Sequence, residues 1–215
     1  MSGRYRPRIV IADDHTLVAE ACKGFLEPEF DIVGIVGDGR ALIDCVSRLN
    51  PAVVLVDIAM PLLNGLDACE RIRSMKQTVR IVVLTMNQDR AVAAEAFRRG
   101  ASGYLLKTSA ACELPIAIRT VLQGKHYISP LMAGDFFELK VEYEGTNRLP
   151  GTLTPRQRQV LQLLAEGRSM KEAGSVLNLT ARTIAFHKYR IMETLHIKNS
   201  AELVHYAIHE HLVPS

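Results

Sequence analysis

The chain has 215 residues, 48% of them hydrophobic, which provides apolar side chains for one large core or two smaller ones, and we expect two. No stretch approaches the ~18 uncharged apolar residues of a membrane span, and the start of the chain lacks the apolar segment of a signal peptide, so we expect a cytoplasmic protein without a membrane partner. The net charge is +3, and residues 151–215 carry eight Lys and Arg against five Glu, whereas the preceding residues are neutral. A basic C-terminal segment favours a polyanionic partner.

The four cysteines predict neither a disulfide framework nor a zinc site. They lie far apart, form no C-x-x-C pair, and each falls within an apolar helical pattern, at Cys22, Cys45, Cys69 and Cys112. Isolated cysteines in such patterns are typical of reduced thiols packed in a core. We therefore expect all four to be reduced core residues.

Apolar strands alternate with amphipathic helices five times between residues 8 and 123. The expected strands are 8–12, 32–36, 53–57, 80–85 and 103–106, and the expected helices are 17–26, 41–49, 66–75, 90–99 and one that ends at 123. The connections are short, which requires parallel strands joined by right-handed crossovers. The pattern predicts an α/β fold with a doubly wound, five-stranded parallel sheet, followed by a small all-α domain.

The third strand runs directly into an aspartate. Residues 53–56 have no polar face, which is typical of a central strand buried on both sides. Asp57 therefore stands at the carboxyl end of a buried strand, where open α/β sheets bind their ligands, and Pro61 and Gly65 mark the loop that follows. Taken alone, Asp57 could equally be a functional group or a carboxylate that only caps a strand or turn.

Other polar residues follow the remaining strands at the same edge of the predicted sheet. Asp13 and Asp14 follow the first strand, Thr85 ends the fourth and Lys107 follows the fifth. Three carboxylates form an oxygen-rich pocket suited to Mg²⁺, and a hydroxyl and an ammonium opposite them suit a phosphoryl group. Each residue by itself has an ordinary structural explanation, but their joint occurrence in this strand order favours an aspartyl-phosphate site with Asp57 as nucleophile.

Two other kinds of site are disfavoured. No G-x-G-x-x-G follows the first strand, as a dinucleotide-binding fold would require. A phosphatase of the aspartyl-phosphate type needs a second acid two residues beyond its nucleophile as a proton donor, and that position is Ala59. We therefore do not expect an enzyme that acts on a separate substrate.

Residues 8–123 resemble the receiver domain of bacterial two-component response regulators. The residues that carry the resemblance are Asp13, Asp14, Asp57, Met60, Pro61, Gly65, Thr85, Lys107 and the apolar run 104–106. The resemblance implies that Asp57 accepts a phosphoryl group from a sensor histidine kinase and that the domain carries out its own phosphotransfer and dephosphorylation. It also implies a Mg²⁺ ion bound by Asp57, by Asp14 directly, by Asp13 through water and by the carbonyl of Ala59.

The same resemblance implies a switch made of Thr85 and Tyr104. Phosphoryl oxygens would draw in the Thr85 hydroxyl and open space into which the Tyr104 ring can turn. One departure is Thr108, because the family often has a proline there, joined to the lysine by a cis bond. A cis bond between Lys107 and Thr108 would cost ~3 kcal/mol, so the sequence leaves the geometry of this bond open.

The last 65 residues carry repeated helix-start signals. Capping boxes stand at 154–157 and 169–172, and Thr180 and Asn199 precede two further helices, which predicts helices from Pro155 to before Gly167 and over 170–177, 181–194 and 201–211. Only three residues join the second and third of these helices, which is the helix-turn-helix signature. We therefore assign residues 1–124 to the receiver domain, 125–150 to a linker and 151–215 to a helix-turn-helix domain.

The third of these helices has a basic face that includes two aromatic side chains. Its inward positions are Ile184, Ile191 and Leu195, and its other face presents Arg182, Ala185, Phe186, Lys188, Tyr189 and Arg190. The three cations suit DNA phosphates, and the other three residues suit base edges in the major groove. A charged face that is simply solvated is the ordinary structural alternative.

Residues 151–212 resemble the NarL/LuxR-type DNA-binding domain. The residues that carry this resemblance are 153–156, Leu161, 165–167, Leu177, Thr183, Ile184, His187 and Leu195. It implies that the partner is double-stranded promoter DNA. Gln157 replaces the usual acid but still serves the capping box, whereas Ala185 and Phe186 offer few hydrogen-bonding groups, so recognition would depend on thymine methyls, Tyr189 and DNA shape.

Together the two halves predict a transcription factor controlled by phosphorylation. The alternative is a DNA-binding regulator that acts without phosphorylation and uses its receiver as a protein-interaction platform. Because one helix-turn-helix binds weakly, we expect a homodimer, paired through an apolar stripe of Leu203, Val204, Ala207 and Ile208. We also expect the unphosphorylated receiver to pack on the C-terminal domain and to cover helix 181–194 or this stripe.

Overall fold

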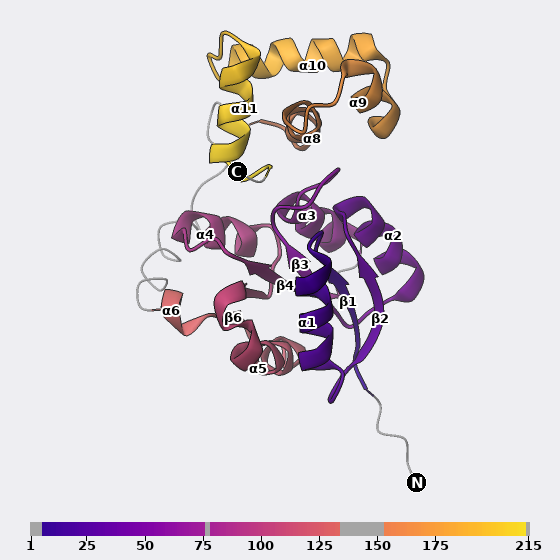
Figure 1. Cartoon of the computed structure of the whole chain (residues 1–215), viewed down its shortest axis with the longest axis vertical. Helices are drawn as coiled ribbons and strands as arrows, with labels where there is room; N and C mark the ends of the chain where they lie inside the picture. The colour runs from indigo at the N-terminus through magenta and orange to yellow at the C-terminus, as the bar shows by residue number, and fades with distance from the viewer. Residues whose placement is uncertain (1–5, 76–77, 134–152, 214–215) are drawn as a thin grey trace.

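The computed structural model describes residues 6–75, 78–133 and 153–213, which form an α/β domain with an all-helical domain stacked on it (Figure 1). The strands of the α/β domain are all parallel and run in the order β2-β1-β3-β4-β5-β6. Their bounds are β1 Arg8–Ala12, β2 Asp31–Val36, β3 Val53–Asp57, β4 Arg80–Thr85, β5 Gly103–Leu106 and β6 Tyr127–Ile128. The predicted doubly wound parallel sheet is confirmed, with one strand more than the predicted five.

Helices cover both faces of the sheet (Figure 1). Helices α1 and α5 pack on one face, and α2, α3 and α4 pack on the other. Their bounds are α1 Thr16–Leu26, α2 Gly39–Leu49, α3 Gly65–Met75, α4 Arg90–Arg98 and α5 Ala110–Leu122, with the short η1 Lys107–Ser109 and α6 Pro130–Ala133 beside them. This two-sided cover explains why the strands are apolar along their whole length.

The side chains of β3 alternate between the two hydrophobic cores. Val53 and Leu55 pack with α1 and α5, whereas Val54 and Val56 pack with the helices on the opposite face, and none of the four is more than 1% exposed. Burial of each such side chain contributes roughly 1.5–3 kcal/mol. The strand is therefore held from both sides, and Asp57 is fixed at its carboxyl end.

β6 and the residues after it, which the sequence assigns to the linker, are part of the receiver domain. β6 pairs with β5 in parallel, and Met132 packs in the core on the side of α2, α3 and α4. Between them, the buried Ser129 hydroxyl accepts a hydrogen bond from the Leu106 N–H at 3.1 Å and donates one to Glu113 at 2.7 Å. Residues 134–150 of the predicted linker lie outside the described residues.

The C-terminal domain consists of four helices around a small core. They are α8 Pro155–Ala165, α9 Met170–Leu177, α10 Ala181–Thr194 and α11 Ser200–His209. Both predicted capping boxes are present, at Thr154 before α8 and at Ser169 before α9. The tight joint after α9 depends on Gly174, because a Cβ there would lie 2.6 Å from the Leu179 carbonyl oxygen. The predicted helix-turn-helix of α9 and α10 is confirmed.

Two expectations about side chains are wrong. Leu203 and Ala207 of the predicted dimer stripe are buried in the core of the C-terminal domain and cannot pair two chains, because α11 needs them to pack on its own domain. Cys112 is exposed on α5, whereas the other three cysteines are buried as predicted. Within the described ranges, none of the helices combines the length and the apolarity that a membrane span requires.

Candidate functional site

The carboxyl ends of the strands bring Asp13, Asp57 and Lys107 together. Lys107 Nζ lies 2.8 Å from Asp13 Oδ2 and 2.9 Å from Asp57 Oδ2. Neither carboxylate residue is more than 5% exposed. One ammonium therefore balances two buried carboxylates that would otherwise repel each other. The bond between Lys107 and Thr108 is trans, so the lysine reaches this position without the cis bond that the family often has.

Burial shifts the acid–base properties of this group. Burial raises the pKa of Asp57, and the neighbouring Lys107 only partly offsets the rise. Burial alone would lower the pKa of Lys107, but its contacts with Asp13 and Asp57 outweigh that effect, and its pKa is raised. The lysine is therefore a permanent cation beside a poorly solvated carboxylate, an arrangement suited to nucleophilic attack on an anionic group.

The loop after Asp57 can follow this path because residue 65 is a glycine. A Cβ on Gly65 would lie 2.0 Å from the carbonyl oxygen of Asp57. No side chain can be accommodated at that distance, because the obstacle is backbone. The start of α3 is therefore packed directly against the end of β3.

The acidic residues at this edge fit a divalent cation. Asp13, Asp14, His15 and Asp57 each place one ligand atom within 4.8 Å of the others. Among the described residues, the buried Oδ2 of Asp13 has the ammonium of Lys107 as its partner, at 2.8 Å, and its second lone pair is still available to a metal ion. Such an oxygen-rich cluster suits Mg²⁺. The three aspartates would hold the ion, with the carbonyl of Ala59 on the adjoining loop.

The two predicted switch residues are both linked to Asn87 in the loop after β4. The Thr85 hydroxyl accepts a hydrogen bond from the Asn87 N–H at 3.1 Å, and the Tyr104 hydroxyl donates one to the Asn87 carbonyl at 3.0 Å. The Tyr104 ring is fully buried. The sequence analysis expects this ring to turn inward on phosphorylation, and in this structure the ring already lies inside.

The loop between β3 and α3 contains a strained turn. The Leu63 N–H donates to the Pro61 carbonyl at 2.7 Å, and Leu62 between them has a φ of 65°. A γ-turn with a positive φ at a bulky residue is unfavourable by itself. It persists only where its surroundings hold it.

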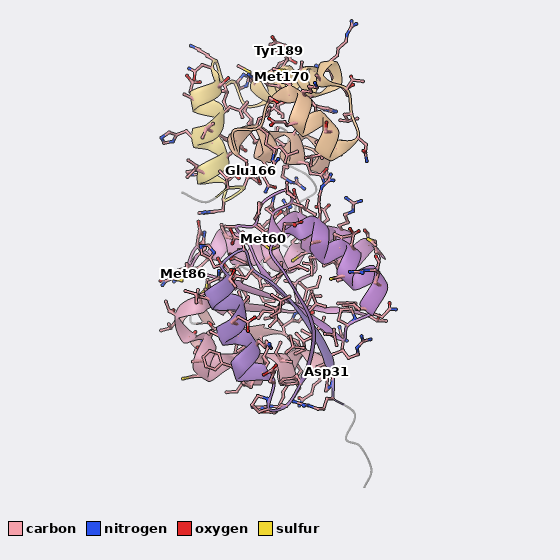
Figure 2. The ribbon with its side chains drawn as sticks, turned by 45° about the vertical axis from the view of Figure 1, so that its right-hand side comes forward. Asp31, Met60, Met86, Glu166, Met170 and Tyr189 are labelled. Atoms are coloured by element: carbon pink, nitrogen blue, oxygen red, sulfur yellow. The ribbon has the colours of Figure 1, made fainter. Side chains whose placement is uncertain are left out.

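Two side chains of α8 and its C-cap hold this turn. Gln162 Nε2 donates to the Met60 carbonyl at 2.8 Å, and Gln162 Oε1 accepts from the Asn64 N–H at 2.9 Å. Glu166 Oε1 accepts from the Leu62 N–H at 3.1 Å and from Gln162 Nε2 at 2.8 Å. Figure 2 shows Glu166 and Met60 on the facing sides of the two domains. We call Gln162 and Glu166 the α8 clamp.

Ion pairs flank the α8 clamp. Arg158 of α8 contacts Asp67 at 3.0 Å and Glu70 at 3.1 Å, and Asp67 is also paired with Arg99. The side chains of Arg158 and Asp67 are 17% and 3% exposed. Removing one partner of such a desolvated ion pair is strongly destabilising, because the other charge is then buried without a partner.

A second contact joins the C-terminal end of the chain to the switch loop. His211 Nε2 lies 2.8 Å from Asn87 Nδ2, so Asn87 touches Thr85, Tyr104 and the C-terminal domain at once. The receiver therefore packs on the C-terminal domain as expected, but it does so through α8 and the residue His211 beyond α11. The expectation that it covers α10 is wrong, because α10 lies on the far side of α8 (Figure 1).

The basic face predicted for α10 is accessible. Phe186 and Tyr189 are 58% and 69% exposed, Arg182 and Arg190 are exposed, and Ala185 and Lys188 are partly exposed. The Arg190 guanidinium lies 5.7 Å from the centre of the Phe186 ring, and Lys188 Nζ donates to the Ser200 hydroxyl at 3.0 Å. Tyr189 stands at the end of the molecule opposite the receiver (Figure 2).

Comparison with known families assigns both domains. Residues 9–119 match the response regulator receiver domain, and residues 151–207 match the bacterial regulatory proteins of the luxR family. This chain belongs to the response regulators. It combines a receiver with a LuxR-type helix-turn-helix, the architecture of a two-component transcription regulator.

Relatives of this response regulator match over nearly their whole length. The transcriptional regulatory protein MctR of Rhizobium johnstonii is 34% identical over 99% of this chain and 98% of its own. The response regulator UvrY of Escherichia coli is 34% identical over 93% of both chains. The solved structure of RcsB from Salmonella typhimurium is 28% identical, covers 94% of this chain and 98% of its own, and has a TM-score of 0.58.

Several site residues of the regulator are not singled out by its sequence. His15 joins the acidic cluster, with Nδ1 2.9 Å from Asp14, and could have been found from its place next to the acid pair. Gln162, Glu166 and His211 have no such signal. Gln162 has the single anomaly of a polar side chain between the apolar Leu161 and Leu163, which a helical pattern alone does not interpret.

Proposed function

We propose that this response regulator accepts a phosphoryl group from a sensor histidine kinase on Asp57 and, in that form, binds promoter DNA as a homodimer through α10. The observation that carries the proposal is the pairing of Lys107 with both Asp13 and Asp57, at 2.8 and 2.9 Å. It places an anionic acceptor beside a fixed cation, which is the requirement for receiving a negatively charged phosphoryl group.

The chemical step exchanges one bond to phosphorus for another. A carboxylate oxygen of Asp57 attacks the phosphorus of a phosphohistidine, an O–P bond forms, and the N–P bond breaks with its electron pair passing to the imidazole, which takes up a proton. The Lys107 ammonium exchanges its contacts with the carboxylates for contacts with the negatively charged phosphoryl oxygens. Mg²⁺, when held by the aspartates, supplies further neutralisation of that charge. Attack of water on the phosphorus of the acyl phosphate breaks the O–P bond, releases inorganic phosphate and restores the Asp57 carboxylate.

The new charge at Asp57 reaches the C-terminal domain through the loop after β4. The Thr85 hydroxyl accepts a hydrogen bond from the Asn87 N–H at 3.1 Å. Phosphoryl oxygens at Asp57 would draw the hydroxyl away from this N–H. Because Asn87 also contacts Tyr104 and His211, its displacement alters the contact between the domains. We propose that the C-terminal domain is released in this way and can then pair on two half-sites.

The accessible face of α10 supplies the DNA contacts in this proposal. Arg182, Lys188 and Arg190 would bind phosphates, and Ala185, Phe186 and Tyr189 would meet base edges. RcsB has been solved in complex with DNA, including two dimers bound to two parallel DNAs, which supports a dimeric DNA-bound form here. A regulator that binds bacterial promoters acts in the cytoplasm, where the DNA lies.

The test combines a small phosphodonor with a variant of the acceptor. The regulator is incubated with acetyl phosphate and Mg²⁺, and its intact mass, oligomeric state and binding to genomic fragments are measured. We expect one added phosphate, dimer formation and tighter DNA binding for the wild type and none of these for Asp57→Asn. If Asp57→Asn dimerised and bound DNA as well as the phosphorylated wild type, the phosphorylation-independent alternative would replace this proposal.

A further inference from the structure

The imidazole of His15 lies among the acids of the candidate site. Its Nδ1 is 2.9 Å from Asp14 Oδ1 and 3.5 Å from Asp13 Oδ1. Together with Asp57, these residues each place one ligand atom within 4.8 Å of the others. Among the described residues, no other group of three or more His, Cys, Asp or Glu side chains gathers its ligand atoms in this way. The site therefore offers a ring nitrogen besides its carboxylate oxygens.

The local backbone explains why the ring lies there. The His15 N–H donates a hydrogen bond to Asp13 Oδ1 at 2.9 Å, which folds the chain back over the acid pair. His15 is also the residue directly before α1, a position where a side chain often accepts a hydrogen bond from the first turn of the helix. The imidazole makes no such bond. The placement of the ring is therefore set by the acids and not by helix capping.

The spacing of these atoms fits a shared metal ion. Ligands that are bound at about 2.1 Å and at right angles to one another lie about 3 Å apart. The 2.9 Å between His15 Nδ1 and Asp14 Oδ1 matches this separation. The His15 side chain is 65% exposed, so water can accept a hydrogen bond from its other ring nitrogen. A neutral imidazole can therefore join the aspartates around one ion.

An imidazole ligand changes which metals a site binds well. Mg²⁺ is a hard cation that prefers oxygen ligands and keeps several of its waters. Imidazole nitrogen suits transition metals, and the affinity of a given site rises in the order Mn²⁺, Fe²⁺, Co²⁺ and Ni²⁺. Replacement of a bound water by the His15 ring would therefore strengthen the binding of these ions more than that of Mg²⁺.

We propose that His15 is a further metal ligand of this site and raises its affinity for divalent transition-metal ions relative to Mg²⁺. The inference rests on the proposed function, because the same aspartates hold the ion there, and it adds the class of ion that the site selects. A histidine that only forms an ion pair with the two neighbouring carboxylates would not discriminate between metals in this way.

The experiment measures metal selectivity in the full-length chain without an added histidine tag. Isothermal titration calorimetry gives the dissociation constants of Mg²⁺, Mn²⁺ and Co²⁺ for the wild type, His15→Ala, His15→Gln and the control His209→Ala. His209 is a matched control, because it is an exposed histidine that lies 3.3 Å from a carboxylate, Glu210, in the other domain. The exposed position of His15 makes both of its variants compatible with the fold.

We expect the ratio of Co²⁺ affinity to Mg²⁺ affinity to fall roughly 10- to 100-fold in both His15 variants, which is the loss typical when a residue that supports a metal site is removed. The fall should be smaller for Mn²⁺, which binds nitrogen less strongly than Co²⁺ does. The control His209→Ala should match the wild type. Equal selectivity in all four chains would overturn the inference.

Two further readouts separate a ligand from a residue that only positions Asp14. The amide of His15→Gln can still donate a hydrogen bond to Asp14 but lacks the ring nitrogen, so wild-type selectivity in this variant would overturn the inference. Pulsed EPR of the Mn²⁺-loaded wild type should show coupling of the ion to a directly bound ¹⁴N nucleus, and both His15 variants should lack it. Absence of that coupling from the wild type would contradict the proposal equally.

Failure of this inference and failure of the proposed function are distinguishable. Binding of beryllofluoride, a stable mimic of the phosphoryl group, to the wild type with Mg²⁺ is followed by ¹⁹F NMR and requires no transition metal. Beryllofluoride binding together with unchanged selectivity of the His15 variants would leave the proposed function intact and remove His15 as a ligand. A wild type that binds neither a metal ion nor beryllofluoride would remove both.

Discussion

At the scale of single residues, burial decides which reactive groups can act. Burial raises the pKa of Asp57, and the ammonium of Lys107 lies 2.9 Å from its carboxylate. This acid is therefore both desolvated and paired with a positive charge. Two buried cysteines also have a cation nearby, Lys107 for Cys22 and Arg99 for Cys69, but burial outweighs it. Burial raises the pKa of Cys22 to about 11 and that of Cys69 to about 12. The same cause therefore prepares one residue for chemistry and removes two others from it.

Thiol labelling tests this description. A raised thiol pKa leaves less thiolate at a given pH, so at pH 8.5 a group with a pKa of about 11 is on the order of 1% thiolate or less, and burial restricts access further. We expect iodoacetamide at that pH to add one label to the native chain, on the exposed Cys112. Peptide mapping after labelling identifies the site. Fast labelling of Cys22 or Cys69 in the folded protein would contradict the burial described.

The cations of α10 give a second test at this scale. Lys188 donates a hydrogen bond to the Ser200 hydroxyl at the start of α11. Its ammonium group is exposed there and can bind a DNA phosphate. We expect Lys188→Ala to weaken binding to all DNA sequences alike and to reduce the slope of log K against log salt by about 1. Phe186→Ala, on the same face, should instead reduce discrimination between sequences. The opposite pattern for Lys188 would remove it from the phosphate contacts.

Among the elements, the edge strand β6 links the end of the receiver to Lys107, the lysine paired with Asp13 and Asp57. The hydroxyl of Ser129, directly after β6, accepts a hydrogen bond from the N–H of Leu106, which precedes Lys107. The same hydroxyl donates a hydrogen bond to Glu113 of α5. The Leu106 backbone is buried, so its N–H would have no alternative partner in water. β6 is short, yet this hydroxyl ties it to both β5 and α5.

Replacement of Ser129 measures the value of that tie. We expect Ser129→Ala to lower the stability of the receiver by about 1–3 kcal/mol, since it leaves the buried Leu106 N–H without its partner and removes one of the two hydrogen bonds to Glu113. The measurement is urea unfolding followed by circular dichroism. Ser109→Ala is the control, because Ser109 donates to the Leu106 carbonyl from a partly exposed position and its loss should cost less. Equal losses for the two variants would show that β6 is not fixed through Ser129.

At the scale of the whole molecule, the two domains share one set of hydrogen bonds around the phosphorylation site. The turn after Asp57 is bonded to α8, and the loop after β4 is bonded to His211. The face of α10 that we propose to contact DNA remains accessible in the same arrangement. In the function that we propose, control by phosphorylation therefore does not depend on covering that face. It would depend on whether the C-terminal domain is free to take the position that a dimer on DNA needs.

Hydrogen exchange followed by mass spectrometry tests this coupling. The N–H groups of Leu62 and Asn64 donate to side chains of the other domain, so they should be protected in the unphosphorylated chain. We expect beryllofluoride with Mg²⁺ to accelerate exchange in peptides that contain residues 60–64, whereas the backbone of α10 should change little before DNA is added. Unchanged exchange of the turn in the beryllofluoride-bound chain would mean that the domains stay in contact.

The layers of the fold and the meeting of Asp13, Asp57 and Lys107 could be predicted from the sequence. Apolar runs such as 53–56 are typical of strands buried on both faces, and short connections require parallel order, which brings Asp13, Asp57 and Lys107 to one edge. Capping boxes likewise fixed the starts of α8 and α9. These features are local or follow from topology, and periodicity reports them directly.

The contacts between the parts of the molecule could not be predicted from the sequence. Ser129 and Met132 joined the receiver through contacts with distant strands and helices, which composition does not report. Leu203 and Ala207 were taken up by the core of their own domain, because an apolar stripe carries no information about which surface it meets. Gln162 gained its role from a turn about 100 residues earlier in the chain. Such pairings depend on the relative placement of two domains, and a polar residue in one helix does not encode its partner in another.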